Sequence, residues 1–309
     1  MNIQNSFQCA LPYFPPPVRK ALSNLQKKDM EQISEIRLRL GRSLRIVRQS
    51  TEFILTSSGL LSSDTSTGIL ITPDRMDMIF QSFCSHSVHA VQHMLKQGYI
   101  TLSGGNRAGI VGTAVLNKQG IEMIRNVSGI NLRIASERQG CAEALLEHPV
   151  LHGTSGGILI VGPPVSGKTT VLRDAARIIG NSAHTCIIDE RGELAAVHNG
   201  MPQFSVGEQT DILDGYPKAE GISIAVRVMS PSVLICDEIG GEDETLAIMM
   251  SLNTGVRLIA SAHAPDLKTA YHRPQIKRLL DAGVFSAAFL LGINSQCGQI
   301  ISAERIQGI

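Results

Sequence analysis

The alternation of apolar and polar residues changes its period near residue 140. Before that point Ile36, Leu38 and Leu40 alternate with Arg37 and Arg39, which is the two-residue period of a half-buried strand. Further strands are expected at 44–47, 53–55, 99–102, 110–116, 121–127 and 130–134, and helices at 18–28 and 87–97. The pattern therefore predicts a smaller N-terminal α+β domain over residues 1–140.

Two short segments of this region predict local structure. Thr72, Pro73 and Asp74 indicate a helix start, because threonine caps the first turn, proline fits its first position and aspartate complements the helix dipole. The Asn-Lys-Gln-Gly sequence at 117–120 predicts a hairpin turn between two of the strands.

The second half of the chain follows a different pattern. Residues 141–157 predict a linker, with a helical stretch at 142–147 followed by Pro149 and a Gly/Ser-rich tract. Short apolar runs then alternate with helical patterns, at 158–161, 186–188, 233–236 and 256–261. Strands alternating with helices are typical of a parallel sheet with crossover helices. We therefore predict an α/β domain with a mainly parallel sheet over residues 158–309.

The first of these apolar runs precedes a phosphate-binding motif, Gly-Pro-Pro-Val-Ser-Gly-Lys-Thr, which fits the G-x-x-x-x-G-K-T (Walker A) pattern. Backbone N–H groups of such a loop surround phosphate oxygens, and the following helix points its positive end at the anion. Lys168 is expected to reach the β- and γ-phosphates of ATP, and the Thr169 hydroxyl to hold Mg²⁺. The candidate nucleotide-binding residues are Gly162, Pro163, Pro164, Val165, Ser166, Gly167, Lys168, Thr169 and Thr170.

Acidic residues follow two later apolar runs. Asp237 and Glu238 come directly after 233–236, and an aspartate at this strand end holds Mg²⁺ in P-loop enzymes. We therefore expect Thr169 and Asp237 to bind the metal, and Glu238 to polarise the attacking water. Glu190 follows another such run and is expected at the same sheet edge, where the active sites of open α/β sheets lie.

Two more side chains are expected near this edge. His263 follows the run at 256–261 and is expected to face the γ-phosphate, while Arg191 is expected to pair with an acid or a phosphate. The catalytic candidates are thus Glu238, Lys168, Glu190 and His263. A metal site at His86, His89 and His93 is disfavoured, because no acid or further ligand completes the set.

Composition limits the class of protein. The chain has 309 residues, 43% of them apolar, and a net charge of +1. The first sixty residues are basic, with nine Lys/Arg against four acids, which indicates a solvated face or a docking surface for an acidic partner, a membrane or nucleic acid. The six scattered cysteines indicate a reducing compartment. No apolar run approaches the length of a transmembrane helix, so any membrane association is expected to be peripheral and without a covalent anchor.

Several motifs resemble the stage III sporulation protein AA family, which belongs to the secretion-type ATPases of type II and type IV systems. They are Asp-Glu-Arg at 189–191, Ser-Pro-x-Val-Leu-Ile-Cys-Asp-Glu at 230–238 and Ser-Ala-His at 261–263. Further similar segments lie at 35–39, 97–101, 104–107, 131–135, 202–203, 206–211 and 217–219, so the resemblance covers most of the chain.

The resemblance implies an AAA/RecA-like core that hydrolyses ATP to ADP and phosphate, and a homo-oligomeric ring, a hexamer by analogy, with ATP at subunit boundaries. It makes Glu190 the counterpart of the family's "Asp box", His263 of its "His box", and Glu238 the catalytic carboxylate. It also implies a cytoplasmic protein, peripheral at the mother-cell side of the forespore envelope. There it would energise a channel whose membrane-embedded subunits belong to the stage III sporulation complex.

One residue departs from the family pattern. Val165 stands where relatives usually have a glycine after the prolines, and valine lacks glycine's freedom to adopt positive φ. We expect nucleotide binding to survive, since Gly162 and Gly167 are kept, but with an altered affinity.

A shared site in a ring needs an arginine supplied by a neighbouring subunit. The candidates are Arg107, Arg125, Arg133, Arg138 and Arg227.

Two alternatives to a motor remain. A nucleic-acid ATPase resembling a helicase loader would use the basic first sixty residues, although aromatics at only 4% argue against it and no nucleic-acid partner is expected. A nucleotide-gated scaffold would bind ATP and barely turn it over.

Overall fold

The computed structural model describes residues 3–118, 120–251 and 255–306, and the chain divides into two compact units. Unit 1 comprises Met1–Glu137 together with His198–Gln203, and unit 2 comprises Arg138–Val197 together with Phe204–Ile309.

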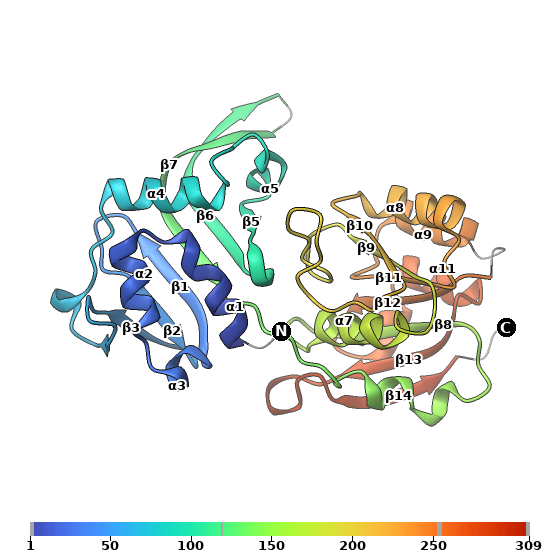
Figure 1. The fold of residues 1–309 in the computed structure, drawn as a ribbon. Helices are drawn as coiled ribbons and strands as arrows, with labels where there is room; N and C mark the ends of the chain where they lie inside the picture. Colours follow the sequence, from blue (N-terminus) through green and yellow to red (C-terminus); the bar gives the residue numbers. More distant parts are fainter. Residues whose placement is uncertain (1–2, 119, 252–254, 307–309) are drawn as a thin grey trace. The chain divides into compact units, whose positions relative to one another are not determined.

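An antiparallel sheet forms the centre of unit 1 (Figure 1). Its order over the described residues is β4-β3-β2-β1-β7-β6-β5. The strands are β1 (Ile33–Arg39), β2 (Arg45–Arg48), β3 (Thr51–Leu55), β4 (Leu61–Ser62), β5 (Tyr99–Thr101), β6 (Arg107–Asn117) and β7 (Gly120–Arg133). The helices are α1 (Ile3–Ala10), α2 (Pro16–Ser23), α3 (Lys27–Met30), α4 (Pro73–Phe83) and α5 (Gln92–Lys96).

The alternation in β1 has the predicted consequence. Ile36 and Leu38 are fully buried, whereas Arg37 and Arg39 are half-buried. Ile36 pairs with Ile46 of β2, so the apolar face continues across the sheet into the core.

The predicted start of α4 is confirmed. The Thr72 hydroxyl accepts the N–H of Arg75, and Pro73 occupies the first helical position.

Other predictions for unit 1 were wrong in detail. The expected helix at 18–28 is two helices, α2 and α3. The strands expected at 121–127 and 130–134 are one strand, β7. Its pairing with β6 shifts register between Val111 and Thr113, and Asn126 has a positive φ of 49°, so the strand continues past the polar residues that separate the two apolar runs.

The helix expected at 87–97 was also too long. Only Gln92–Lys96 is helical, because Ser85 and His86 adopt positive φ and the chain turns before it becomes helical. His89 therefore lies outside the helix, and the described residues hold no cluster of metal-binding side chains. The turn expected at 117–120 includes Gln119, which lies outside the described residues.

A mainly parallel sheet forms the centre of unit 2, with the order β10-β9-β11-β12-β8-β13-β14 among described residues. The strands are β8 (Gly157–Gly162), β9 (Thr185–Asp189), β10 (Thr210–Asp214), β11 (Val233–Cys236), β12 (Arg257–His263), β13 (Phe285–Leu291) and β14 (Ile300–Arg305). Only β14 runs antiparallel to its neighbour in this order.

Helices cover both faces of this sheet, as Figure 1 shows. They are α6 (Glu143–Leu146), α7 (Lys168–Ile179), α8 (Lys218–Ile224), α9 (Glu242–Ser251), α10 (Leu267–Tyr271) and α11 (Pro274–Asp281), with a π-helical turn at Ala225–Met229 after α8. In β8, Ile158 and Ile160 pack on the face with α7, whereas Leu159 and Val161 pack on the face with α8 to α11.

Because both faces are covered, the strands are continuous apolar runs rather than alternating ones. The predicted fold class, an α/β P-loop core with a mainly parallel sheet preceded by an α+β region, is confirmed. Within the described ranges, no helix combines the length and hydrophobicity that crossing a bilayer requires.

Candidate functional site: a phosphate-binding loop beside an acidic strand end

The motif predicted from the sequence lies in a strand–loop–helix unit. Strand β8 ends at Gly162, and α7 begins at Lys168. Gly167 caps the helix with φ of +87°, and a Cβ there would lie 3.1 Å from the backbone nitrogen of Gly298. The same nitrogen donates a 2.9 Å hydrogen bond to the Ser166 carbonyl, so a segment after β13 fixes the loop.

Val165, the residue that departed from the family pattern, also has a positive φ, of 64°. Its side chain is 88% exposed, so no packing compensates for the strain of a β-branched residue in this region. The position therefore suits glycine better than valine.

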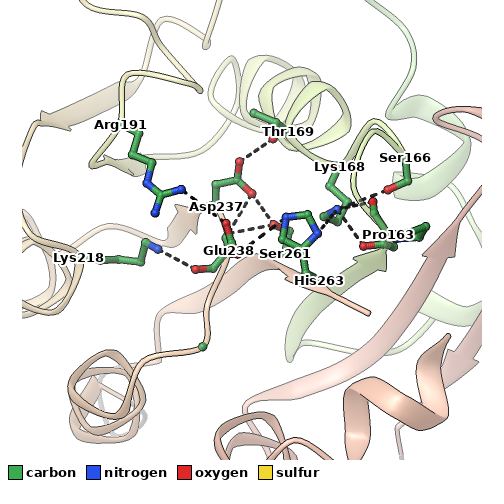
Figure 2. Close-up of polar contacts among 12 residues, drawn as sticks. Pro163, Ser166, Lys168, Thr169, Arg191, Lys218, Asp237, Glu238, Ser261 and His263 are labelled. Atoms are coloured by element: carbon green, nitrogen blue, oxygen red, sulfur yellow. Dashed lines mark hydrogen bonds and ion pairs between the residues drawn. The ribbon is translucent and has the colours of Figure 1, made fainter. Parts of the chain in front are cut away.

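Lys168 is held at the base of the loop. Its ammonium donates 2.9 Å hydrogen bonds to the carbonyls of Gly162 and Pro163, and it lies 3.1 Å from Nδ1 of His263 (Figure 2). Burial lowers the pKa of Lys168 below its usual value, and the carboxylates of Asp237 and Glu238 offset part of that effect. Because the protonated lysine has only donors, Nδ1 of His263 accepts this hydrogen bond in the tautomer that leaves Nδ1 without a proton.

Thr169 and Asp237 form a pair of oxygen ligands suited to a hard cation. The Thr169 hydroxyl donates a 2.6 Å hydrogen bond to Oδ2 of Asp237, and the Ser261 hydroxyl contacts Oδ1 of the same carboxylate. Magnesium binds oxygen at about 2.1 Å in octahedral geometry, so neighbouring ligands lie about 3 Å apart. The two oxygens, 2.6 Å apart, would need to separate by only a few tenths of an ångström to bind one Mg²⁺ side by side.

Glu238 has an unusual backbone conformation, with φ of +42°. Its N–H donates 2.9 Å hydrogen bonds to the Ser261 hydroxyl and to Oδ1 of Asp237. Its carboxylate lies 3.8 Å from Nε2 of His263 and 3.8 Å from Nη1 of Arg191, as Figure 2 shows. The predicted pairing of Arg191 with an acid is thus present, and it joins the ends of β9 and β11.

The neighbouring acids Asp189 and Glu190 have different surroundings. Asp189 is buried, and its carboxylate accepts the N–H groups of Glu193, Leu194 and Ala195, so it shapes the loop after β9. Glu190 instead lies 3.9 Å from Nζ of Lys218. These side chains line a cavity of about 30 Å³ that Asp237 and Glu238 also line, which is room for about one or two water molecules.

Arg173 of α7 supports the same loop. Its guanidinium donates to the carbonyls of Glu193 and Leu194 and stacks on the ring of Phe204, 3.6 Å from the centroid. Burial lowers the pKa of Arg173 to about 10, which leaves it charged near neutral pH.

A larger pocket of about 520 Å³ adjoins the other end of the phosphate-binding loop. Gly167 and Thr170 line it together with Arg138, Leu145 and Ile300, and most of its wall is apolar. Apolar concave sites with a few polar groups are typical of small-molecule binding.

Some basic side chains of the first sixty residues have partners within unit 1. Arg37 and Arg45 pair with Glu52, and Arg48 pairs with Asp29. Arg39 donates to the carbonyls of Leu38 and Ile130. These contacts involve four of the nine basic side chains, and the excess of basic over acidic residues remains.

The candidate trans arginines have diverse surroundings. Arg107 stacks on Tyr99 at 3.5 Å, and Arg125 contacts the sulfur of Met123. Arg227 lines a groove between α8 and α9. Arg138 lines the pocket beside Gly167 and Thr170 of its own chain.

No role for Ser261 or Lys218 was predicted from the sequence. Ser261 is the first residue of the Ser-Ala-His segment that resembles the family, but a role was inferred only for His263. Lys218 belongs to the similar segment at 217–219, and the helix that begins with it, α8, was not predicted.

Comparison with known proteins agrees with this architecture. The chain is 35% identical over 278 residues to stage III sporulation protein AA of Bacillus subtilis (strain 168), covering 88% of this chain and 86% of that protein. It is 29% identical over 184 residues to the uncharacterized protein ycf45 of Cyanidium caldarium, covering 57% of this chain and 52% of that one.

Solved structures share the fold at low sequence identity. The pilus retraction motor PilT with bound ADP aligns with a TM-score of 0.57 and 16% identity, over 85% of this chain and 76% of that one. The Legionella pneumophila ATPase DotB aligns with a TM-score of 0.54 and 14% identity, over 84% and 72%.

The model of one family, described as "Sporulation stage III, protein AA", matches residues 13–309. With this match over nearly the whole chain and the similarity to the Bacillus subtilis protein, the chain belongs to the sporulation stage III protein AA family.

Proposed function

We propose that this protein binds ATP with Mg²⁺ and hydrolyses it to ADP and phosphate as a motor of the secretion type. The observation that carries the proposal is the meeting of the phosphate-binding loop with Asp237, Glu238 and His263 at one sheet edge. Relatives of the same fold include a pilus retraction motor with bound ADP.

Each side chain has a role in this proposal. Lys168 exchanges its loop carbonyls for β- and γ-phosphate oxygens, and Thr169 and Asp237 hold Mg²⁺, which neutralises charge on the phosphates when bound. Glu238 accepts a proton from the attacking water. His263 contacts the γ-phosphate, and Glu190 helps to orient the water in the cavity that it lines.

The apolar pocket beside Gly167 and Thr170 takes the nucleoside part of ATP. Its position next to the start of α7 supports this assignment, because the phosphates lie at that helix N-terminus. Arg138 lines the pocket and is therefore expected to contact the nucleotide bound to its own chain.

We further propose that subunits form a homo-oligomeric ring, a hexamer by analogy with secretion ATPases, with one of Arg107, Arg125, Arg133 or Arg227 completing a neighbour's site. The ring would act at the mother-cell side of the forespore membrane, on membrane-embedded subunits of the stage III sporulation channel. Membership of the sporulation stage III protein AA family supports this setting.

Turnover measured over a series of protein concentrations, together with native mass, tests the ring. Specific activity is expected to rise with the population of oligomer. A monomer whose specific activity does not depend on concentration contradicts a shared site. DNA or RNA is expected to leave turnover unchanged, whereas salt-sensitive stimulation would favour the nucleic-acid alternative.

A further inference from the structure

Lys218 contacts three different acidic residues from the first position of α8. Its ammonium donates a 2.7 Å hydrogen bond to the main-chain carbonyl of Glu238, and it lies 3.4 Å from Oε1 of Glu244 and 3.9 Å from Oε2 of Glu190 (Figure 2 shows the contact with Glu238). The side chain is only 10% exposed. A largely buried cation at a helix N-terminus is unfavourable by itself, so these contacts are what stabilises it.

The hydrogen bond from Lys218 to the main-chain carbonyl of Glu238 stabilises a residue with a strained backbone. A non-glycine residue with φ of +42° lies in a sparsely populated region and costs about 1–3 kcal/mol unless its surroundings fix it. Ser261 and Asp237 accept the N–H of Glu238, while Lys218 donates to its carbonyl. The backbone is thus held on both sides, which fixes the point from which the Glu238 side chain extends.

The same ammonium lies at the wall of the cavity of about 30 Å³ that Glu190 and Glu238 line. Lys218 therefore links the end of β9, through the Glu190 carboxylate, to the end of β11, through the Glu238 carbonyl, beside a space for about one or two waters. The Lys218 ammonium contacts the Glu238 carbonyl, which lies outside the phosphate-binding loop at 162–169.

We propose that Lys218 is a positioning residue for ATP hydrolysis, which joins Glu190 and Glu238 into one unit and aims the Glu238 carboxylate at the attacking water. This inference rests on the proposed function. Lys218 acts through Glu238, so its loss lowers the rate of hydrolysis without weakening nucleotide binding.

A purely structural role makes a different prediction. Glu244 of α9 also accepts the N–H groups of Gly240 and Gly241, so its contact with Lys218 is a link between helices. Glu244→Gln weakens this link and leaves the contact between Lys218 and Glu238 in place. It is the matched control for Lys218→Met, which removes both.

The experiment compares kcat for ATP, the Kd of a fluorescent ADP analogue and the melting temperature of the full chain. Lys218→Met is expected to lower kcat roughly 10- to 100-fold, the size of effect that misplacement by about 1 Å produces, while Kd stays within about twofold. Lys218→Arg, which keeps the cation, restores part of the rate, and Glu244→Gln stays within about threefold of wild type.

A double variant shows through which residue Lys218 acts. Lys218→Met is expected to cost nothing further in the Glu238→Gln background, because the two residues form one unit. Should Lys218→Met not fold, Lys218→Gln, which keeps a donor but loses the charge, is judged by the same kcat and Kd readouts.

Two results overturn the proposal and are distinguishable. If wild-type turnover depends on Lys168 but is unchanged in Lys218→Met, or falls equally in Glu244→Gln, Lys218 has no positioning role. If wild-type protein shows no turnover that depends on Lys168, the proposed function fails, and the role of Lys218 fails with it.

Discussion

The hydroxyl of Thr169 and the carboxylate of Asp237 lie 2.6 Å apart although 68 residues separate them in the chain. The parallel pairing of β8 with β12 and of β12 with β11 brings the two strand ends to one edge of the sheet. A helix start and an acidic strand end are thereby joined into one candidate Mg²⁺ site.

Removing the Thr169 hydroxyl is expected to impair the use of Mg²⁺. Thr169→Ala takes away one of the two proposed protein ligands, so turnover is expected to fall roughly 100-fold and to need more Mg²⁺. Thr169→Ser keeps the hydroxyl and is the matched control. Turnover measured against Mg²⁺ concentration checks this, and an alanine variant that titrates like wild type would remove Thr169 from the metal site.

Val165→Gly is expected to stabilise the fold. The left-handed conformation costs an L-residue about 1–2 kcal/mol, and glycine's extra freedom in the unfolded chain returns about 0.5–1 kcal/mol of that, so a net gain of about 0.5–1 kcal/mol remains. Val165→Ala keeps a Cβ and is expected to gain less. Denaturant unfolding measures both, and a less stable glycine variant contradicts strain at this position.

Asp189 is expected to matter for stability. Its buried carboxylate accepts three backbone N–H groups of one loop, and Asp189→Ala leaves them without that acceptor, at a cost of about 2–4 kcal/mol. Asp211→Ala, at an exposed carboxylate paired with His184, is expected to cost less than about 1 kcal/mol. Equal losses of unfolding free energy in the two variants would refute the structural role of Asp189.

Asp214 is expected to make stability depend on pH. Loss of hydration and the neighbouring Asp189 raise the pKa of Asp214 to about 6 from its ordinary 3.8. The folded state then binds more protons than the unfolded state between these values, so this group's contribution to stability falls as pH rises from about 4 to about 6.

Asp214→Asn removes that dependence. Its melting temperature is expected to exceed that of wild type more at pH 7.5 than at pH 4. A difference between the two proteins that is the same at both pH values would show that Asp214 does not titrate in this range.

The residues of the candidate site were easier to predict from the sequence than the elements of unit 1. A phosphate-binding loop is a local motif, and the burial of parallel strands on both faces makes their ends easy to locate. Asp237 and Glu190 were therefore placed at strand ends correctly. His263, predicted to follow its strand, is instead the last residue of β12.

What escaped prediction depends on long-range contacts. The continuity of β7 depends on an irregularity in its pairing with β6, which periodicity does not encode. The contacts of Ser261 and Lys218 with Glu238 join three separate elements, and neither contact was predicted from the sequence.

The roles of Lys168 and Glu238 can be separated by substitution. Lys168→Ala is expected to lose both ATP binding and turnover, because its ammonium supplies charge to the phosphates. Glu238→Gln keeps the shape of the site and loses only the base, so it is expected to bind ATP and retain it.

Retention of radiolabelled ATP by Glu238→Gln during a single turnover is the most direct test of the central claim. We predict that this variant holds ATP with near wild-type affinity and hydrolyses it at least about 100-fold more slowly than wild-type protein. Hydrolysis by Glu238→Gln at the wild-type rate would contradict the assignment of this sheet edge as the catalytic site.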